Sequence, residues 1–247
     1  MKIRNLDLNF FFFLIFCLVT WLLCEQIADI RRWAQRIDKR NLIYMDETHL
    51  RISDAPLTTL VVPGERQYVI VDDNSSYALR YDMICFISGE RVYPAIVYTP
   101  EDRAALGVKG ITAKMLNDFI VELLGPALGA EDRYPMYLLL DRSTIHNVEK
   151  MTESFKEGNC YEVTEMKFMP TKSAKRLSPL DNGLFHDWKE RCRKHAPLTE
   201  KNIVSVMTTE WDKTTSEQLY IYYKHCGLAR SSSTYADCTQ PNLHDHA

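Results

Sequence analysis

The stretch YLLLDRSTIHN, Tyr137–Asn147, decides the fold of this chain. Its first four residues, Tyr137–Leu140, form a short apolar run without a helical stripe, which is typical of a strand buried on both faces. Asp141 ends the run, and a carboxylate at the carboxyl end of a buried strand lies where open α/β sheets bind their ligands. An ordinary strand end with a solvated aspartate has the same pattern, so other stretches must support the interpretation.

A second stretch, NLIYMDETHLRI at Asn41–Ile52, repeats this pattern. The apolar run Leu42–Met45 ends in Asp46, and Glu47 follows directly. Because side chains alternate along a strand, Asp46 and Glu47 are expected on opposite sides. We therefore expect only one of the two in a shared site.

A third acidic stretch is LSPLDNGLFHDWK, Leu177–Lys189. Asp181 lies between Pro179 and Gly183, at or just before a predicted helix, where the helix dipole favours a negative charge. A plain N-cap role for Asp181 is the alternative.

The rest of the chain predicts an α/β fold with mixed strand directions. Turn residues and apolar patterns predict a strand in Leu60–Val71, a hairpin over Tyr81–Tyr98 that turns at Ser88-Gly89, and a strand over Glu162–Met169. Apolar residues at helical spacing predict a helix over Thr112–Leu124, ended by Pro126, a helix from Val148 to Gly158, and a helix marked by Ile203, Met207 and Trp211. A basic loop is predicted over Pro170–Arg176.

Length and charge narrow the function classes. The 247 residues suffice for one large domain or two small ones. A net charge of −3 gives no global attraction to nucleic acid, so any DNA contact needs a local positive region. Lys167–Lys201 is such a region, with nine Lys or Arg against four acids, although a solvated helix face is the alternative. The seven cysteines, odd in number and without CxxC, suit a reducing compartment.

Three carboxylates, Asp46, Asp141 and Asp181, thus lie at the ends of predicted elements. Hard cations such as Mg²⁺ prefer oxygen ligands, which carboxylates from several segments supply. Phosphodiester cleavage and transfer use two such cations about 4 Å apart to clamp the attacking and leaving oxygens. Because these carboxylates would repel one another without a metal, the group makes sense mainly as a metal site.

The same three stretches resemble motifs of a known family. They are IYMDET at Ile43–Thr48, similar to a hydrophobic strand ending in DE(S/T); LLD at Leu139–Asp141 with Ile145–Asn147 behind it, similar to LDN-x-x-x-H; and SPLDNG at Ser178–Gly183 with Phe185 and Lys189, similar to PLD-x-G-x-F. Pro63-Gly64 and the Tyr81–Gly89 strand also fall where that family has a turn and its second strand. Over residues 40–228 the chain resembles the catalytic domain of Tc1/mariner–pogo DDE/DDD transposases.

This resemblance implies an RNase H-like fold, an α/β mixed sheet flanked by helices. It implies DNA strand cleavage at transposon ends and joining of the freed 3′-OH to target DNA, with Asp46, Asp141 and Asp181 as ligands of a two-metal Mg²⁺ or Mn²⁺ site and no side-chain nucleophile. Glu47 and His146 are candidates for places in or beside the site, with structural roles as the alternative. DNA is the implied partner, a homodimer is a further expectation, and the nucleus is the expected location.

The chain departs from the family at two positions. Arg142 stands where the family often has Asn, and Asp181 replaces the Glu of the Tc1 branch, as in the mariner and pogo branches. Only about 40 residues precede the first motif, so we expect a truncated copy without the helix-turn-helix domain that reads transposon ends. A catalytically silent, domesticated DNA- or protein-binding module is one rival reading, and a membrane-anchored protein is another.

The N-terminus carries the membrane alternative. Phe10–Cys24 has one polar residue, Thr20, and resembles a signal anchor, but its 15 residues fall short of the roughly 20 that cross a bilayer. A mispredicted, non-native coding segment is the other explanation. We expect three regions: an apolar segment at 1–35, the catalytic domain at 36–228 and a disordered tail at 229–247.

Two weaker patterns complete the sequence. Cys226, Cys238, His244 and His246 have a spacing that could bind zinc, but it is tighter than in usual fingers, and a disordered tail is the favoured reading. Asn74-Ser75-Ser76 is a glycosylation sequon that matters only in a secreted chain.

Overall fold

A computed structural model describes residues 8–54, 79–131 and 135–229, with side chains from residue 15 onward. The strands are β1 (Leu42–Arg51), β2 (Arg80–Ile87), β3 (Ile96–Tyr98), β4 (Met136–Leu140) and β5 (Val163–Phe168). The helices are α1 (Leu8–Ala34), α2 (Pro100–Ala105), α3 (Ala113–Phe119), α4 (Gly125–Gly129), α5 (Val148–Glu157), α6 (Ala174–Leu177), α7 (Phe185–Arg193), α8 (Ile203–Asp212) and α9 (Ser216–His225), with π-helical turns η1 (Ile120–Leu124) and η2 (Leu180–Leu184).

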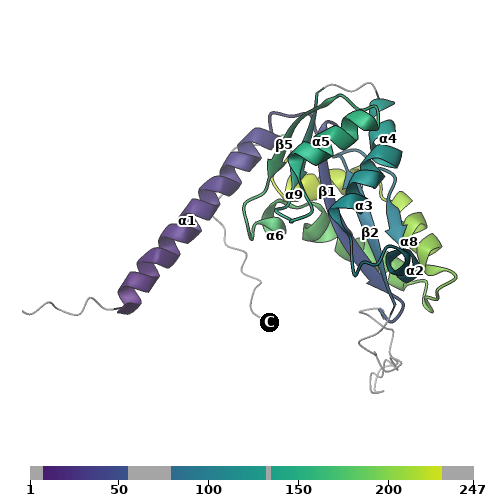
Figure 1. Ribbon diagram of the computed structural model, residues 1–247. Helices are drawn as coiled ribbons and strands as arrows, with labels where there is room; N and C mark the ends of the chain where they lie inside the picture. Colours follow the sequence, from purple (N-terminus) through teal and green to yellow (C-terminus); the bar gives the residue numbers. More distant parts are fainter. Residues whose placement is uncertain (1–7, 55–78, 132–134, 230–247) are drawn as a thin grey trace, which may run out of the picture.

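The described strands form one sheet in the order β3-β2-β1-β4-β5 (Figure 1). The β1–β2 and β2–β3 pairs are antiparallel, whereas β1–β4 and β4–β5 are parallel. This arrangement confirms the predicted mixed sheet. It also puts β1 and β4 side by side at its centre. Asp141 follows the end of β4 as predicted, but the prediction that Asp46 ends its strand is wrong, because β1 continues through Asp46 to Arg51 by pairing with β2.

Alternating side chains of the central strands lie in two separate cores, one on each face of the sheet. Leu42 and Tyr44 of β1 lie in one core, whereas Ile43 and Met45 lie in the other. All four are at most 1% exposed, because helices cover both faces of the sheet. Burial on both faces explains why these strands read as continuous apolar runs.

The two faces receive their helices from different parts of the chain. Residues of α3, η1, α4 and α5 fill one core, in front of the sheet in Figure 1. Residues of α1, α7, α8 and α9 fill the other, behind it. The second layer therefore joins the N-terminal helix to the C-terminal third of the chain.

The helix predicted over Thr112–Leu124 begins with Thr112 as its N-cap, since the Thr112 side chain accepts the Met115 N–H. The expected stop at Pro126 is wrong. η1 follows α3 without a break, and Pro126 occupies the first turn of α4. Proline is tolerated there because it follows the π-helical turn η1, where the Gly125 N–H already donates to the Ile120 carbonyl and the regular helical ladder is interrupted.

Two further expectations need correction. The returning strand of the predicted hairpin is short: beyond a single bridge between Ile87 and Val92, only Ile96–Tyr98 pairs with β2. Pro94 interrupts it, because proline has no N–H to donate to a ladder. The predicted basic loop contains the short helix α6. The helices over Val148–Glu157 and Ile203–Asp212 and the strand over Val163–Phe168 are confirmed.

The apolar N-terminal segment and the charged segment after it form one helix, α1. Its C-terminal part packs on the body through Ile27 and Ala34, and Trp33 donates to Glu165 at 2.9 Å. Its N-terminal part projects away from the body (Figure 1), where Phe16 and Trp21 are 69% and 61% exposed. In the described part of the chain, no helix combines the length and apolar character that crossing a membrane requires.

Several expectations concern residues outside the described ranges. They are the strand in Leu60–Val71, the Pro63-Gly64 turn, the sequon at Asn74, the tail at 230–247 and three of the four zinc candidates, Cys238, His244 and His246. The six described cysteines, Cys226 among them, are all free.

Candidate active site

The register of the two central parallel strands places Asp46 and Asp141 at the same level. Tyr44 of β1 lies opposite Leu139 of β4, and each aspartate follows two residues later. Because strand side chains repeat every two residues, both aspartates share the face of Tyr44 and Leu139. Adjacent strands are roughly 4.8 Å apart, so the two carboxylates are neighbours at the point where β4 ends and β1 continues.

Asp181 reaches the same face from η2, whose Leu180 and Leu184 are buried in that core. The predicted N-cap role of Asp181 is wrong, because its side chain caps no helix and its own N–H donates to Ser178 Oγ at 2.9 Å. Gly183 makes this turn with φ of +143°. A Cβ there would lie 2.7 Å from the Tyr222 ring, so the backbone path beside Asp181 requires glycine.

Asp46 and Asp181 face each other as an electrostatically unfavourable pair. Burial raises the pKa of Asp46 to about 8, and the negative charges of Asp181 and Glu47 add to the rise. Burial also raises the pKa of Asp181. A hydrogen bond with Asp46 lowers this pKa, but its effect is smaller than that of burial. The Glu47 N–H donates to Asp46 at 2.8 Å, yet Asp46 has no cation against it in the described residues.

Asp141 belongs to a chain of contacts through His146, whose side chain is fully buried. His146 Nε2 lies 3.0 Å from Glu47 Oε1, and His146 Nδ1 lies 2.7 Å from Asp141 Oδ1 and 3.2 Å from the Asp141 carbonyl oxygen. Burial lowers the pKa of His146, but the two carboxylates outweigh it and raise this pKa to about 10. His146 therefore acts as the cation that holds Asp141 beside Glu47.

This chain of contacts separates the two acids of β1. Asp46 and Glu47 point to opposite sides, as predicted, since their partners on β2, Cys85 and Ile84, lie in different cores. Asp46 faces Asp181, whereas Glu47 is tied to Asp141 through His146. That only one of the pair enters a shared site stays a prediction. The family resemblance put Glu47 and His146 among the candidates, and their contact supplies the physical connection.

The donor set fits a hard divalent cation. Asp141 Oδ1 lies 2.7 Å from the protonated His146 ring, and it has no other hydrogen-bond partner within the described ranges. Asp46 is buried beside Asp181 with no cation against it, so its carboxylate oxygens offer ligands whose charge a hard cation would balance. As they stand, however, no three described His, Cys, Asp or Glu side chains are grouped closely enough to hold one ion. The carboxylates are divided between the Asp46–Asp181 pair and the His146 chain, so metal binding requires them to draw together.

An open cleft of about 470 Å³ adjoins Asp181 and Glu47. It is lined by Glu47, Thr48, His49, Asp181, Phe185, His186, Lys189 and Arg193. Sequence reasoning singled out neither His49 nor His186. The missed signal is the i, i+3, i+7 spacing of His186, Lys189 and Arg193, which puts three basic side chains on one face of a helix.

Comparison with known proteins gives both a family and a fold. The family of DDE superfamily endonucleases matches residues 91–220, which include Asp141 and Asp181. The Mos1 transposase paired-end complex with left transposon end is similar to this chain with a TM-score of 0.61 and 12% identity, covering 83% of this chain and 57% of that one. The catalytic domain of Mos1 mariner transposase gives a TM-score of 0.56 and 10% identity, covering 83% and 86%.

This chain spans 57% of the Mos1 chain in the paired-end complex with left transposon end. The mariner Mos1 paired end complex with Mg is similar with a TM-score of 0.55 and 13% identity, covering 83% of this chain and 58% of that one. No curated protein matches. The mixed sheet flanked by helices thus has the RNase H-like fold of the Mos1 catalytic domain. Because the matching family covers more than half of its residues, the chain belongs to the DDE superfamily endonucleases.

Proposed function

We propose that this chain is the catalytic domain of a Tc1/mariner–pogo-like transposase, which cleaves DNA strands at transposon ends and joins the 3′ ends to target DNA. The observation that carries the proposal is the convergence of three carboxylates from three segments. The register of β1 and β4 places Asp46 and Asp141 at the same level along the two strands, and η2 places Asp181 beside Asp46.

Mg²⁺ or Mn²⁺ is the proposed cofactor, held as a two-metal site by Asp46, Asp141 and Asp181. When bound, such ions activate the attacking water or 3′-OH and stabilise the leaving oxygen. Solved complexes of Mos1 with Mg and with Mn support this choice for the present chain. The burial of Asp46 beside Asp181, with no cation against it in the described residues, supports this choice independently.

The remaining residues prepare this site. The Glu47 N–H holds one oxygen of Asp46, so that its carboxylate faces Asp181. His146 keeps Asp141 and Glu47 in place by contacting both. The expected partner is DNA at transposon ends and at the target, as in the Mos1 complex with the left transposon end. A homodimer and a nuclear location belong to the same proposal.

The test is nicking of supercoiled plasmid by the purified full chain with Mg²⁺ or Mn²⁺. Asp141→Asn keeps the shape of the side chain but removes its charge, and we expect nicking to fall about 10²–10³-fold, the usual loss when one charge-stabilising group leaves a reacting centre. Chelation with EDTA should abolish nicking by the parent protein.

A matched control is Glu153→Gln, which removes an exposed carboxylate from α5. Its nicking rate should equal that of the parent protein. Equal nicking by the parent and Asp141→Asn would contradict the carboxylate assignment. Absence of nicking from well-folded parent protein would favour the silent, domesticated module.

A further inference from the structure

Helix α7 carries a row of basic side chains along the cleft beside the proposed metal site. His186, Lys189 and Arg193 fall within a narrow arc of the helix, because residues three and seven positions apart share a face. Phe185, Trp188 and Cys192 have the same spacing one position earlier and are buried in the core. Packing of that inner face fixes the rotation of α7 and so aims the basic row at the cleft.

Lys189 is held in this cleft without a counter-charge in contact. The side chain is partly buried, and none of the described carboxylates lies within ion-pair distance of it. Burial lowers the pKa of Lys189. The negative charges of Asp54 and Asp181 raise this pKa, but their effects are smaller than that of burial. The same charge contributes, after burial, to a lowered pKa of His49 across the cleft. A half-buried, unpaired ammonium is costly unless a ligand supplies the anion.

Arg193 extends the basic row by one helical turn, about 6 Å along the axis. Its Nη1 pairs with Glu190 at 2.5 Å, whereas its Nε is buried without a hydrogen bond to any described residue. No described residue thus satisfies this Nε. Together, Lys189 and Arg193 put two cationic side chains on the lining of a cleft that Asp181 also lines.

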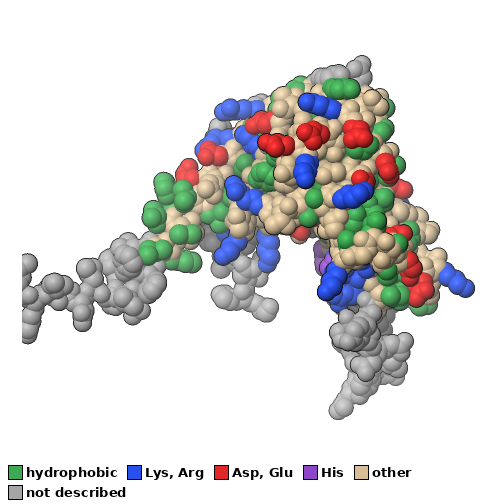
Figure 2. Space-filling view, viewed as in Figure 1, with side chains coloured by type: hydrophobic (Ala, Val, Ile, Leu, Met, Phe, Trp, Pro, Cys, Tyr) green, Lys and Arg blue, Asp and Glu red, His purple; other side chains and the backbone are tan. Residues whose placement is uncertain are grey.

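A second cleft beside Glu47 lacks the basic side chains of the first. This cleft of about 360 Å³ shares Glu47, Thr48 and His49, but its other lining residues are Asp82, Ile111, Ser143, Thr144 and Ile145. None of its lining residues in the described part of the chain is Lys or Arg. On the face that Figure 2 draws, Asp and Glu side chains gather over α5. Anion binding close to the carboxylates is thus favoured on the α7 side.

We propose that Lys189, assisted by Arg193, binds a backbone phosphate of the DNA strand and thereby positions the neighbouring phosphodiester at Asp46, Asp141 and Asp181. This inference rests on the proposed function, and it assigns both side chains as positioning residues. A phosphate is the fitting anion because DNA offers a row of them along the strand, and such contacts fix register without reading sequence.

The test measures binding apart from cleavage. A fluorescein-labelled DNA duplex with a single-stranded 3′ overhang is titrated with the full chain in EDTA, by anisotropy, at several salt concentrations. Lys189→Gln should weaken binding about fivefold to tenfold and reduce the slope of log K against log salt by about 1. The matched control is Lys194→Gln, which removes an exposed lysine at the end of the same helix, outside the cleft. It should change affinity less than twofold.

A merely structural role is separated by a conservative variant. Lys189→Arg should restore the parent salt slope, and thermal unfolding should show all three variants folded. Equal affinities and slopes for Lys189→Gln and Lys194→Gln would overturn the inference, as would absence of DNA binding by the parent or failure of Lys189→Arg to restore the slope. Because no metal or turnover is involved, a clear Lys189 effect in a protein that never nicks plasmid would sustain this contact while removing the proposed cleavage.

Discussion

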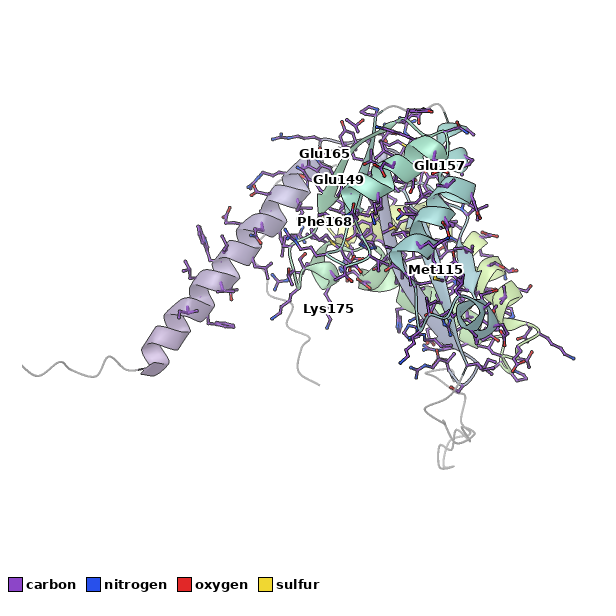
Figure 3. The ribbon with its side chains drawn as sticks, in the orientation of Figure 1. Met115, Glu149, Glu157, Glu165, Phe168 and Lys175 are labelled. Atoms are coloured by element: carbon purple, nitrogen blue, oxygen red, sulfur yellow. The ribbon has the colours of Figure 1, made fainter. Side chains whose placement is uncertain are left out.

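Helices α5 and α7 cover opposite faces of the same sheet and differ in what they present to solvent. The exposed acids of α5, Glu149, Glu153 and Glu157, recur every four residues and so form a stripe; Figure 3 labels the first and last of them. The corresponding outward row of α7 is basic and borders the cleft.

The inner faces of these helices are alike. On α5, Met151 and Phe155 are at most 1% exposed, and on α7, Trp188 and Cys192 are fully buried. Packing therefore constrains both helices in the same way and leaves their outer faces unconstrained. The difference in charge reflects what each face meets, which for α7 is the proposed DNA strand.

The largest effects should come from the shared property, core packing. Trp188→Ala and Phe155→Ala should each lower the free energy of unfolding by about 3–5 kcal/mol, because each leaves a large cavity. Trp188→Ala also removes the hydrogen bond from its Nε1 to the Met207 carbonyl at 3.1 Å. Urea unfolding followed by circular dichroism measures both. A small loss in only one variant would show that the two faces are not packed equally well.

An effect of intermediate size on the free energy of unfolding should distinguish the buried acid Asp46 from the exposed acids of α5. The raised pKa of Asp46 means that the folded state binds its proton more tightly, so the stabilising contribution is present below its ordinary pKa of 3.8 and is lost as pH rises towards about 8. In EDTA, Asp46→Asn should therefore become more stable than the parent by about 2–4 kcal/mol between pH 4 and 8.

Thermal unfolding at a series of pH values measures this gain, and Glu153→Gln serves as its control. The control should show no such pH-dependent gain, because its carboxylate is exposed. Adding Mg²⁺ at pH 8 should stabilise the parent and not Asp46→Asn. A pH-independent difference between parent and Asp46→Asn would contradict the buried, uncompensated state of this carboxylate.

The smallest effect should come from the acidic stripe itself. Glu153→Gln should leave DNA affinity within about twofold of the parent at 0.15 M salt, because charges farther than the Debye length of about 8 Å are screened. Anisotropy with the same labelled duplex measures it. A gain as large as the Lys189 loss would show that DNA passes over α5, contrary to the comparison of the two helices.

Much of the sheet could be predicted from the sequence because its signals are local. Tyr137–Leu140 and Leu42–Met45 read as strands since helices bury both of their faces, and Asn147 and Gly158 mark the two ends of α5 through capping. The errors have local causes too: Pro126 fits the first turn of a helix as well as the end of one.

The sequence by itself determined which residue types were available: three aspartates beside apolar runs and an excess of lysine and arginine over 167–201. Only the tertiary structure decided how they meet. The register between β1 and β4 places Asp46 and Asp141 at the same level, and buried His146 contacts Glu47 across 99 residues of sequence and so ties it to Asp141. Strand pairing and side-chain burial depend on contacts between distant segments, and these contacts cannot be deduced from local propensity or spacing.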